Sequence, residues 1–288
     1  MINLIVTHRA PDLDAITSVW LFQRFDAQNM GGTKVAFVNP GETISAHMAE
    51  QLGSLPHEVI HVDTGLGEFD HHQPDRGKQY LSAAKLVYEH LSKQRPELQK
   101  DAALEALVAY VTDIDQFAQI DWPESKTIRS RFSLDELISG FTLLPNFDDE
   151  RMVEIGKSLL DSAYASLHLY LEAEEELKSA ESVPLKEGYC VAVLASNDYV
   201  IDVAQMQGAS MVIKKDPELG NIRIKCRPDF PDDLSRLRDA VLEKDREGTW
   251  YYHPSGKMFL NGSTKKPDQK PSRLELHEVL SLVKVLYS

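Results

Sequence analysis

The chain has 288 residues, of which 42% are hydrophobic and 26% are charged, and it carries a formal net charge of −14. This length suggests about two domains, and the hydrophobic content is sufficient for ordinary globular cores. The acidic balance argues against binding of long duplex nucleic acid through a broad basic face. No apolar run reaches the ~18 residues of a membrane helix, so no membrane partner is expected.

The chain begins directly with a strand pattern and lacks the charged region and apolar stretch of a signal peptide. We therefore expect a cytoplasmic protein. Its two cysteines, Cys190 and Cys226, are far apart in the sequence. They are predicted to be reduced core thiols, and a disulfide between them is the alternative.

The first predicted elements are a strand, a turn and a helix. The apolar run 4–7 ends at His8, a turn with a proline follows, and Asp12 and Asp14 precede an amphipathic segment, 16–25. Ligands bind outside the carboxyl ends of strands in open α/β sheets, so these three side chains are candidate ligands. The alternative is a helix cap, which explains only one of the two aspartates.

The next predicted strands are residues 34–38 and 59–62, and Asp63 follows the second of them. A few residues later comes the motif Asp70-His71-His72. Aspartate is rarely buried unless paired, and two adjacent histidines cannot both face a core. Imidazole nitrogens and carboxylate oxygens suit Mn, Zn, Fe or Mg, and Asp63 could bridge two ions. The alternative is a surface loop that carries two histidines by chance.

Two predicted helices follow, 82–92 and 98–111, and the second leads to Asp113 and Asp115. Oxygen and imidazole ligands therefore occur at four separate places, each near the end of an element. Two divalent ions held in this way could generate hydroxide from water and clamp both sides of a phosphoryl group.

Together these segments resemble the motifs of the DHH phosphoesterase superfamily, whose members include RecJ-type exonucleases, nanoRNases, cyclic-dinucleotide phosphodiesterases and family II inorganic pyrophosphatases. The residues that carry the resemblance are His8-x-x-Pro11-Asp12-x-Asp14-Ala15-Ile16-x-Ser18, Val62-Asp63-Thr64, Asp70-His71-His72 and Thr112-Asp113. They occur in the family's order within the first 115 residues, and together they are specific although each alone is weak.

The resemblance implies a two-metal site. One ion would be held by His8 and Asp12, the other by Asp14 and His71, with Asp63 as the bridge. The last ligand would be Asp113, with Asp115 as its competitor. The catalytic residues would be His72, which faces the phosphate, and Asp70, which orients an imidazole. The implied cofactor is two Mn²⁺ ions, with Mg²⁺ as the alternative.

Two features depart from the usual DHH pattern. Thr17-Ser18 stands where the family usually has Gly-Ser, and the link from Asp63 to Asp70 is short, because most members insert a helix and a strand there. The short form resembles the divergent branch that includes Myg-type exonucleases. The short link therefore changes the expected substrate more than the expected metal chemistry.

The fold predicted from these elements is α/β, with a mostly parallel sheet in an N-terminal DHH-like catalytic domain, 1–147. A linker helix, 148–183, leads to a smaller α/β domain, 184–288, which the resemblance implies is a DHHA1-like substrate-binding domain. In that second domain we expect strands at 189–194, 211–213 and 221–227. Helices are expected at 200–207, 234–244 and 272–286.

Arg223, Lys225 and Arg227 alternate with apolar residues and would share one face of a strand. Such a face could recognise phosphate, or it could be the solvated face of an antiparallel sheet. The charge distribution agrees with a short charged substrate. Residues 1–183 hold 15 basic and 30 acidic side chains, whereas residues 184–288 hold 16 and 15.

A glycine-containing segment near residue 255 resembles a degenerate version of the family's substrate-binding motif. Its candidate substrate-binding residues are His253, Lys257, Asn261 and Gly262. Glycines let backbone amides approach a ligand. The alternative is a β-hairpin turn at Pro-Ser-Gly-Lys, which needs no function.

The sequence thus predicts a hydrolase that cleaves phosphodiester bonds of short oligonucleotides or small nucleotides through water activated by two metals. The first alternative is an inorganic pyrophosphatase or phosphomonoesterase that uses the same site. The second is a non-catalytic protein that senses a nucleotide. Homodimerisation stays open.

Overall fold

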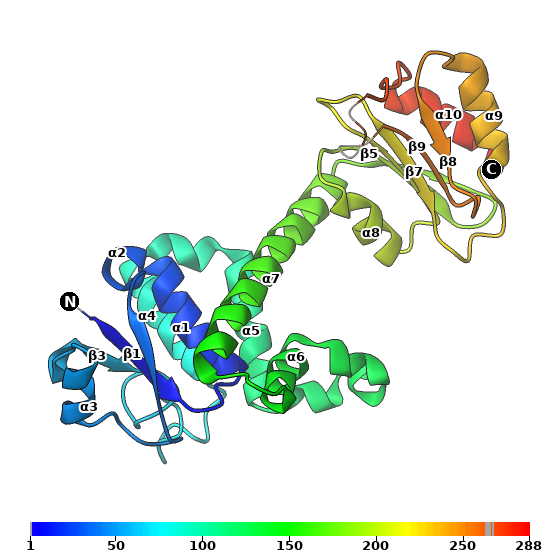
Figure 1. Ribbon diagram of the computed structural model, residues 1–288. Helices are drawn as coiled ribbons and strands as arrows, with labels where there is room; N and C mark the ends of the chain where they lie inside the picture. Colours follow the sequence, from blue (N-terminus) through cyan, green and yellow to red (C-terminus); the bar gives the residue numbers. More distant parts are fainter. Residues whose placement is uncertain (1, 263–265, 267) are drawn as a thin grey trace. The chain divides into compact units, whose positions relative to one another are not determined.

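The computed structural model describes residues 2–262, 266 and 268–288, which divide into two compact units between residues 167 and 168. The boundary falls inside α7 (Asp149–Leu177), drawn in green in Figure 1. The predicted linker helix, 148–183, ends earlier than expected, at Leu177, because the chain after it forms a turn and then strand β4 (Glu181–Pro184). No helix in the described part of the chain is long and apolar enough to cross a membrane.

The first unit contains a parallel sheet of three strands in the order β2-β1-β3. The strands are β1 (Leu4–His8), β2 (Lys34–Val38) and β3 (Val59–His61). The side chains of Leu4, Ile5 and Val6 are fully buried. A central parallel strand is covered on both faces, and for this reason it reads as a continuous apolar run rather than an alternating one.

Six α-helices precede α7 in the described part of the first unit. They are α1 (Leu13–Phe25), α2 (Ala27–Met30), α3 (Ala46–Gln51), α4 (Ala83–Gln94), α5 (Ala102–Asp115) and α6 (Leu134–Gly140). Helix α5 begins four residues later than predicted, because the segment after Pro96 forms a 3₁₀ turn, η2 (Pro96–Lys100). Between α5 and α7 the chain also forms 3₁₀ turns, which are η3 (Ala118–Asp121), η4 (Pro123–Lys126), η5 (Ile128–Phe132) and η6 (Phe141–Leu143).

Helix α1 is the central helix of the first unit, and it is buried on almost every side. Gly156 of α7 packs directly against it, and a Cβ atom at that position would lie 2.8 Å from Cγ2 of Ile16. The Trp20 indole donates a hydrogen bond to Asp161 of α7 and packs edge-on against Tyr164. These contacts fix α1, and with it the aspartates at its amino end.

The second unit contains a mixed sheet of six strands in the order β4-β5-β6-β7-β9-β8, in which only β5 and β6 are parallel. The strands after β4 are β5 (Tyr189–Leu194), β6 (Met211–Lys215), β7 (Ile222–Cys226), β8 (Trp250–Tyr252) and β9 (Met258–Asn261). The strand predicted at 211–213 extends to Lys215, since two lysines continue the pairing with β7. Strands β8 and β9 form the hairpin that the Pro-Ser-Gly-Lys turn predicts.

The helices of the second unit are α8 (Tyr199–Met206), α9 (Ser235–Lys244) and α10 (Leu276–Tyr287). One apolar cluster joins the sheet to α9 and α10, and a second joins it to α8 and the end of α7. The sheet is therefore covered on both faces. Cys190 and Cys226 are both buried as free thiols, as the sequence predicts for a reduced protein.

Candidate metal centre

The candidate metal centre lies at the carboxyl ends of β1 and β3, which are parallel neighbours. His8 is the last residue of β1, and Asp63 follows β3. Asp63 has a φ of 53°, in the left-handed region that aspartate adopts more readily than most residues. Its N–H donates to the carbonyl of Phe69 at 2.9 Å. This turn returns the chain to the strand end just before Asp70, so the short link from Asp63 to Asp70 is closed by a single turn.

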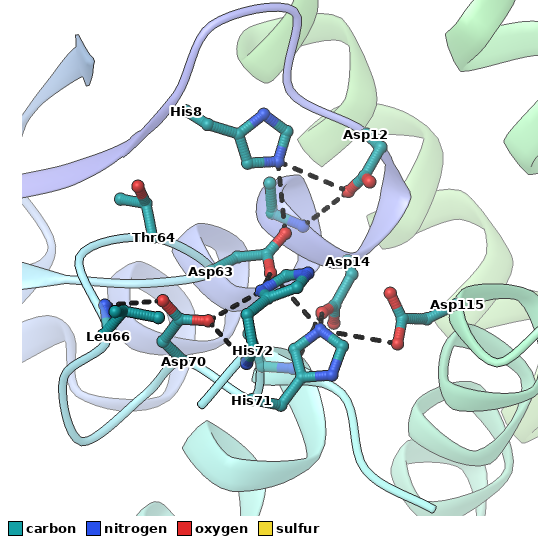
Figure 2. A network of polar contacts seen from close by, with 12 residues as sticks. His8, Asp12, Asp14, Asp63, Thr64, Leu66, Asp70, His71, His72 and Asp115 are labelled. Carbon is teal, nitrogen blue, oxygen red and sulfur yellow. Dashed lines mark hydrogen bonds and ion pairs between the residues drawn. The ribbon is translucent and has the colours of Figure 1, made fainter. Parts of the chain in front are cut away.

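The first group of polar side chains joins the two strand ends to α1. Nε2 of His8 lies 3.2 Å from Oδ2 of Asp63 and 3.9 Å from Oδ1 of Asp12 (Figure 2). Asp12 is also the N-cap of α1, where it accepts a hydrogen bond from the Ala15 N–H. A carboxylate has about four lone-pair sites, so capping the helix leaves sites on Asp12 for a metal.

The second group lies on the other side of Asp63. Nε2 of His71 lies 3.5 Å from Oδ1 of Asp63, 3.8 Å from Oδ2 of Asp14 and 3.5 Å from Oδ2 of Asp115. Asp14 is buried, and its two oxygens accept hydrogen bonds of 2.7 and 2.8 Å from the first two backbone N–H groups of α4. The amino end of α4 thus stabilises a buried negative charge beside His71.

Asp63 belongs to both groups and presents a different oxygen to each. The ligand-type atoms of each of the following sets lie within 4.8 Å of one another: His8, Asp12 and Asp63; Asp14, His71 and Asp115; Asp63, His71 and His72. Among the described residues, Oδ1 of Asp63 and Nε2 of His71 are buried without a hydrogen-bond partner. Buried polar atoms are rarely left in this state. The residues therefore fit two divalent cations, to which these two atoms would be ligands.

The pKa values of the candidate ligands are shifted because several carboxylates lie close together in the site. Burial raises the pKa of Asp14 well above its usual value, and the charges of Asp63 and Asp115 add to this. Burial alone would lower the pKa of His8, but its hydrogen bond to Asp63 and the negative charges nearby outweigh that effect and raise it to about 9. Because these pKa values are raised, protons compete with divalent cations for the two side chains.

We expect Mn²⁺ to stabilise the first unit against heat. A ligand at about 100 times its Kd stabilises the native state by about 2.7 kcal/mol, which corresponds to a rise in Tm of roughly 5–10 °C for a domain of this size. Differential scanning calorimetry with and without MnCl₂ measures the shift. EDTA should reverse it, NaCl of equal ionic strength should not reproduce it, and an unchanged Tm would contradict the metal centre.

Asp70 and His72 form a hydrogen-bonded pair next to these groups. Oδ1 of Asp70 accepts from Nδ1 of His72 at 2.7 Å and from its backbone N–H at 3.0 Å, and Oδ2 accepts from the Leu66 N–H at 2.7 Å. Asp70 is fully buried, whereas 59% of the His72 side chain is exposed. The two adjacent histidines therefore differ: His71 turns inward to the carboxylates, and His72 stays accessible with its ring oriented by Asp70 (Figure 2).

Arg76 holds the loop around Asp70 in place, although no sequence motif marks it. Its guanidinium donates to the carbonyls of Glu68 at 2.8 Å and Asp70 at 2.9 Å. These bonds fasten the loop that carries Asp70 and the two histidines. A single arginine in a polar loop carries no motif, so only the contacts reveal this role.

Of the two aspartates proposed as the last ligand, Asp115 lies beside the other candidate ligands and Asp113 does not. Asp113 lies outside the groups described above and accepts a hydrogen bond of 2.7 Å from the hydroxyl of Tyr80. Asp115 lies beside His71 instead. Both residues are on α5, and with 3.6 residues per turn two positions two residues apart point about 200° apart around the axis. Only one of them can face the site, and it is Asp115.

The cations predicted on β7 are each paired with an acidic side chain. Arg223 contacts Asp198 at 2.7 Å, and Lys225 contacts Asp202 at 2.6 Å. Arg227, just beyond the strand, contacts Asp229 at 2.9 Å. Asp198 and Asp202 come from the start of α8, so this helix covers the basic face. Each of these cations is therefore held in an ion pair, and 30% to 39% of its side chain is exposed.

Three of the residues predicted to bind substrate make contacts that stabilise the second unit. His253 and Lys257 hold the hairpin: the His253 ring accepts from the Ser255 N–H, and the Lys257 ammonium donates to the carbonyls of residues 230 and 232. Asn261 is buried and donates to two backbone carbonyls. Gly262 and Arg223, by contrast, line one small cavity of about 60 Å³.

Comparison with known proteins gives structural neighbours only. No protein-family model and no curated protein matches the chain. Among solved structures, a DHH-domain protein described as a member of a family of ribosomal proteins matches with a TM-score of 0.34 and 15% identity, over 100% of this chain and 88% of that one. RecJ from Thermus thermophilus, in complex with Mn²⁺, matches with a TM-score of 0.30 and 13% identity, over 98% of this chain and 51% of RecJ.

The chain thus spans about half the length of RecJ. A second RecJ structure, in complex with Mg²⁺, matches with a TM-score of 0.30 and 13% identity over 49% of its chain. Similarities at these TM-scores carry no argument about activity.

Proposed function

We propose that the first unit is a metal-dependent phosphoesterase that hydrolyses phosphodiester bonds of short oligonucleotides or small nucleotides. The observation that carries the proposal is Asp63, which presents one oxygen to His8 and the other to His71. A carboxylate placed in this way can bridge two cations that lie a few ångströms apart. Such a pair suits the displacement of an ester oxygen at phosphorus.

The side chains divide between two ion positions. His8 and Asp12 would hold one ion, and Asp14, His71 and Asp115 the other, with Asp63 shared. When bound, the ions would supply Lewis acidity and a more acidic water molecule. Mn²⁺ is the ion proposed, with Mg²⁺ as the alternative, because mixed imidazole and carboxylate ligands suit Mn²⁺ better than Mg²⁺.

His72 is proposed to act on the substrate directly. An ionised Asp70 only accepts hydrogen bonds, so Nδ1 of His72 carries the proton between them. Nε2 is then the atom left for the substrate. With a proton it donates to a phosphate oxygen or to the leaving oxygen, and buried Asp70 keeps the ring in place for that step.

A substrate screen with Mn²⁺ tests the function. We expect turnover of dinucleotides or other nucleotide phosphodiesters, and no turnover after EDTA treatment. Faster release of phosphate from pyrophosphate or from phosphorylated nucleosides would favour a pyrophosphatase or phosphomonoesterase at the same site. Binding of a nucleotide without its consumption would indicate a sensor, and it would contradict the proposal.

A further inference from the structure

The segment between α5 and α7 leaves large apolar side chains in contact with water. The exposed fractions are 77% for Phe117, 71% for Ile120 and 75% for Phe132. Phe117 also has a φ of 58°, in the left-handed region that bulky residues rarely adopt. Strained residues cluster at ligand clamps, and exposed apolar groups that gather in one place mark binding sites.

These side chains border a cavity of about 560 Å³. Tyr110 and Trp122 lie side by side on its wall, with ring centroids 5.6 Å apart and an angle of 32° between the planes. The wall also carries polar groups, which include Arg129 and Asp135. A volume of this size and a mostly apolar wall with a few polar groups are typical of sites for small ligands.

The aromatic cavity adjoins the candidate metal centre. A neighbouring cavity of about 220 Å³ is lined by Asp12, Asp14 and Asp115. The two cavities have four lining residues in common, which are Ile114, Phe117, Gln119 and Asp135. One ligand can therefore place an anionic group at the carboxylates through bound metal and an apolar group among the aromatic rings.

We propose that the aromatic cavity binds the nucleobase of the substrate whose phosphate lies at the metal centre. The proposal rests on the function proposed above and names the part of the chain that selects a base. A base has two flat faces for the aromatic rings and polar edges for Arg129 and Asp135. An apolar protein segment would cover the same rings, but it has no anionic group for the adjoining metal centre.

Isothermal titration calorimetry in the presence of Mn²⁺ tests the proposal with two probes. AMP and ribose 5-phosphate carry the same phosphate, and only AMP carries a base. The double variant Ile120→Ser/Phe132→Ser changes two residues that line the aromatic cavity and not the cavity at the carboxylates. It should weaken AMP binding by on the order of tenfold to a hundredfold, because stacking of a base on an aromatic side chain contributes about that much. Binding of ribose 5-phosphate should be unchanged.

Both side chains are largely exposed, so their replacement should not unfold the protein. Leu143→Ser is the matched control, since Leu143 is 84% exposed in the same segment and is not among the residues that line the cavity. Equal weakening of both probes, or of neither, would overturn the proposal.

The failure of this proposal and the failure of the proposed function are distinguishable. In steady-state kinetics the double variant should raise KM for a dinucleotide and leave the hydrolysis of pyrophosphate, if any, unchanged. If the double variant turned over the dinucleotide with an unchanged KM, the proposed base-binding cavity would be refuted and the proposed phosphoesterase activity would stand. If the protein bound AMP through its base but hydrolysed no phosphodiester, the base-binding cavity would stand and the proposed phosphoesterase activity would be refuted.

Discussion

Asp63→Asn is expected to reduce Mn²⁺-dependent hydrolysis by about a thousandfold or more. The carboxylate faces His8 with one oxygen and His71 with the other, and asparagine keeps the shape but loses the charge and one of the two acceptor oxygens. A loss of about 4 kcal/mol in the stabilisation of the transition state, which is the scale of a metal's contribution, corresponds to about a thousandfold. Initial rates on a dinucleotide with Mn²⁺ measure the change.

Asp75→Asn is the matched control for this variant. Asp75 is an exposed residue in the loop after the two histidines, and its replacement should retain wild-type activity. Far-UV circular dichroism should show the same secondary structure for both variants. Full activity of Asp63→Asn would refute the two-metal proposal.

Much of the candidate metal centre follows from the sequence because its proposed ligands come directly after regular elements. The apolar run of β1 is unmistakable since both faces are buried, and His8 and Asp12 follow within a few residues. Asp63 comes just after the shorter strand β3. Parallel strands that end at one edge of a sheet then bring these side chains together without any further information.

Other features depend on contacts between distant segments, which no local pattern reveals. The cations of β7 are paired because α8 crosses that face, and only the fold shows that Asp198 and Asp202 lie there. In the 3₁₀ turns between α5 and α7 the spacing of the apolar residues changes within a few residues, from every second position at 118–122 to a spacing of four positions between 128 and 132. The cavity that they form therefore has no signal in the sequence.

Asp115→Asn should lower activity by on the order of a hundredfold or more, whereas Asp113→Asn should leave it within about twofold. The reason is helical phase: α5 turns Asp115 toward His71, at 3.5 Å, and Asp113 toward the hydroxyl of Tyr80, at 2.7 Å. Asparagine at 113 keeps an oxygen that can accept the tyrosine hydrogen bond. Activity assays together with Mn²⁺ titration calorimetry measure both effects.

The two variants remove the same charge from the same helix, so general electrostatic effects on α5 cancel in the comparison. We expect Asp115→Asn to weaken the binding of one Mn²⁺ ion and to spare the other, since His8 and Asp12 lie on the opposite side of Asp63. Asp113→Asn should bind both ions with unchanged affinity. If Asp113→Asn instead caused the larger loss of activity and of Mn²⁺ affinity, Asp113 would be the ligand that the family pattern favours. Helix α5 would then have to rotate about its axis to bring Asp113 to the site.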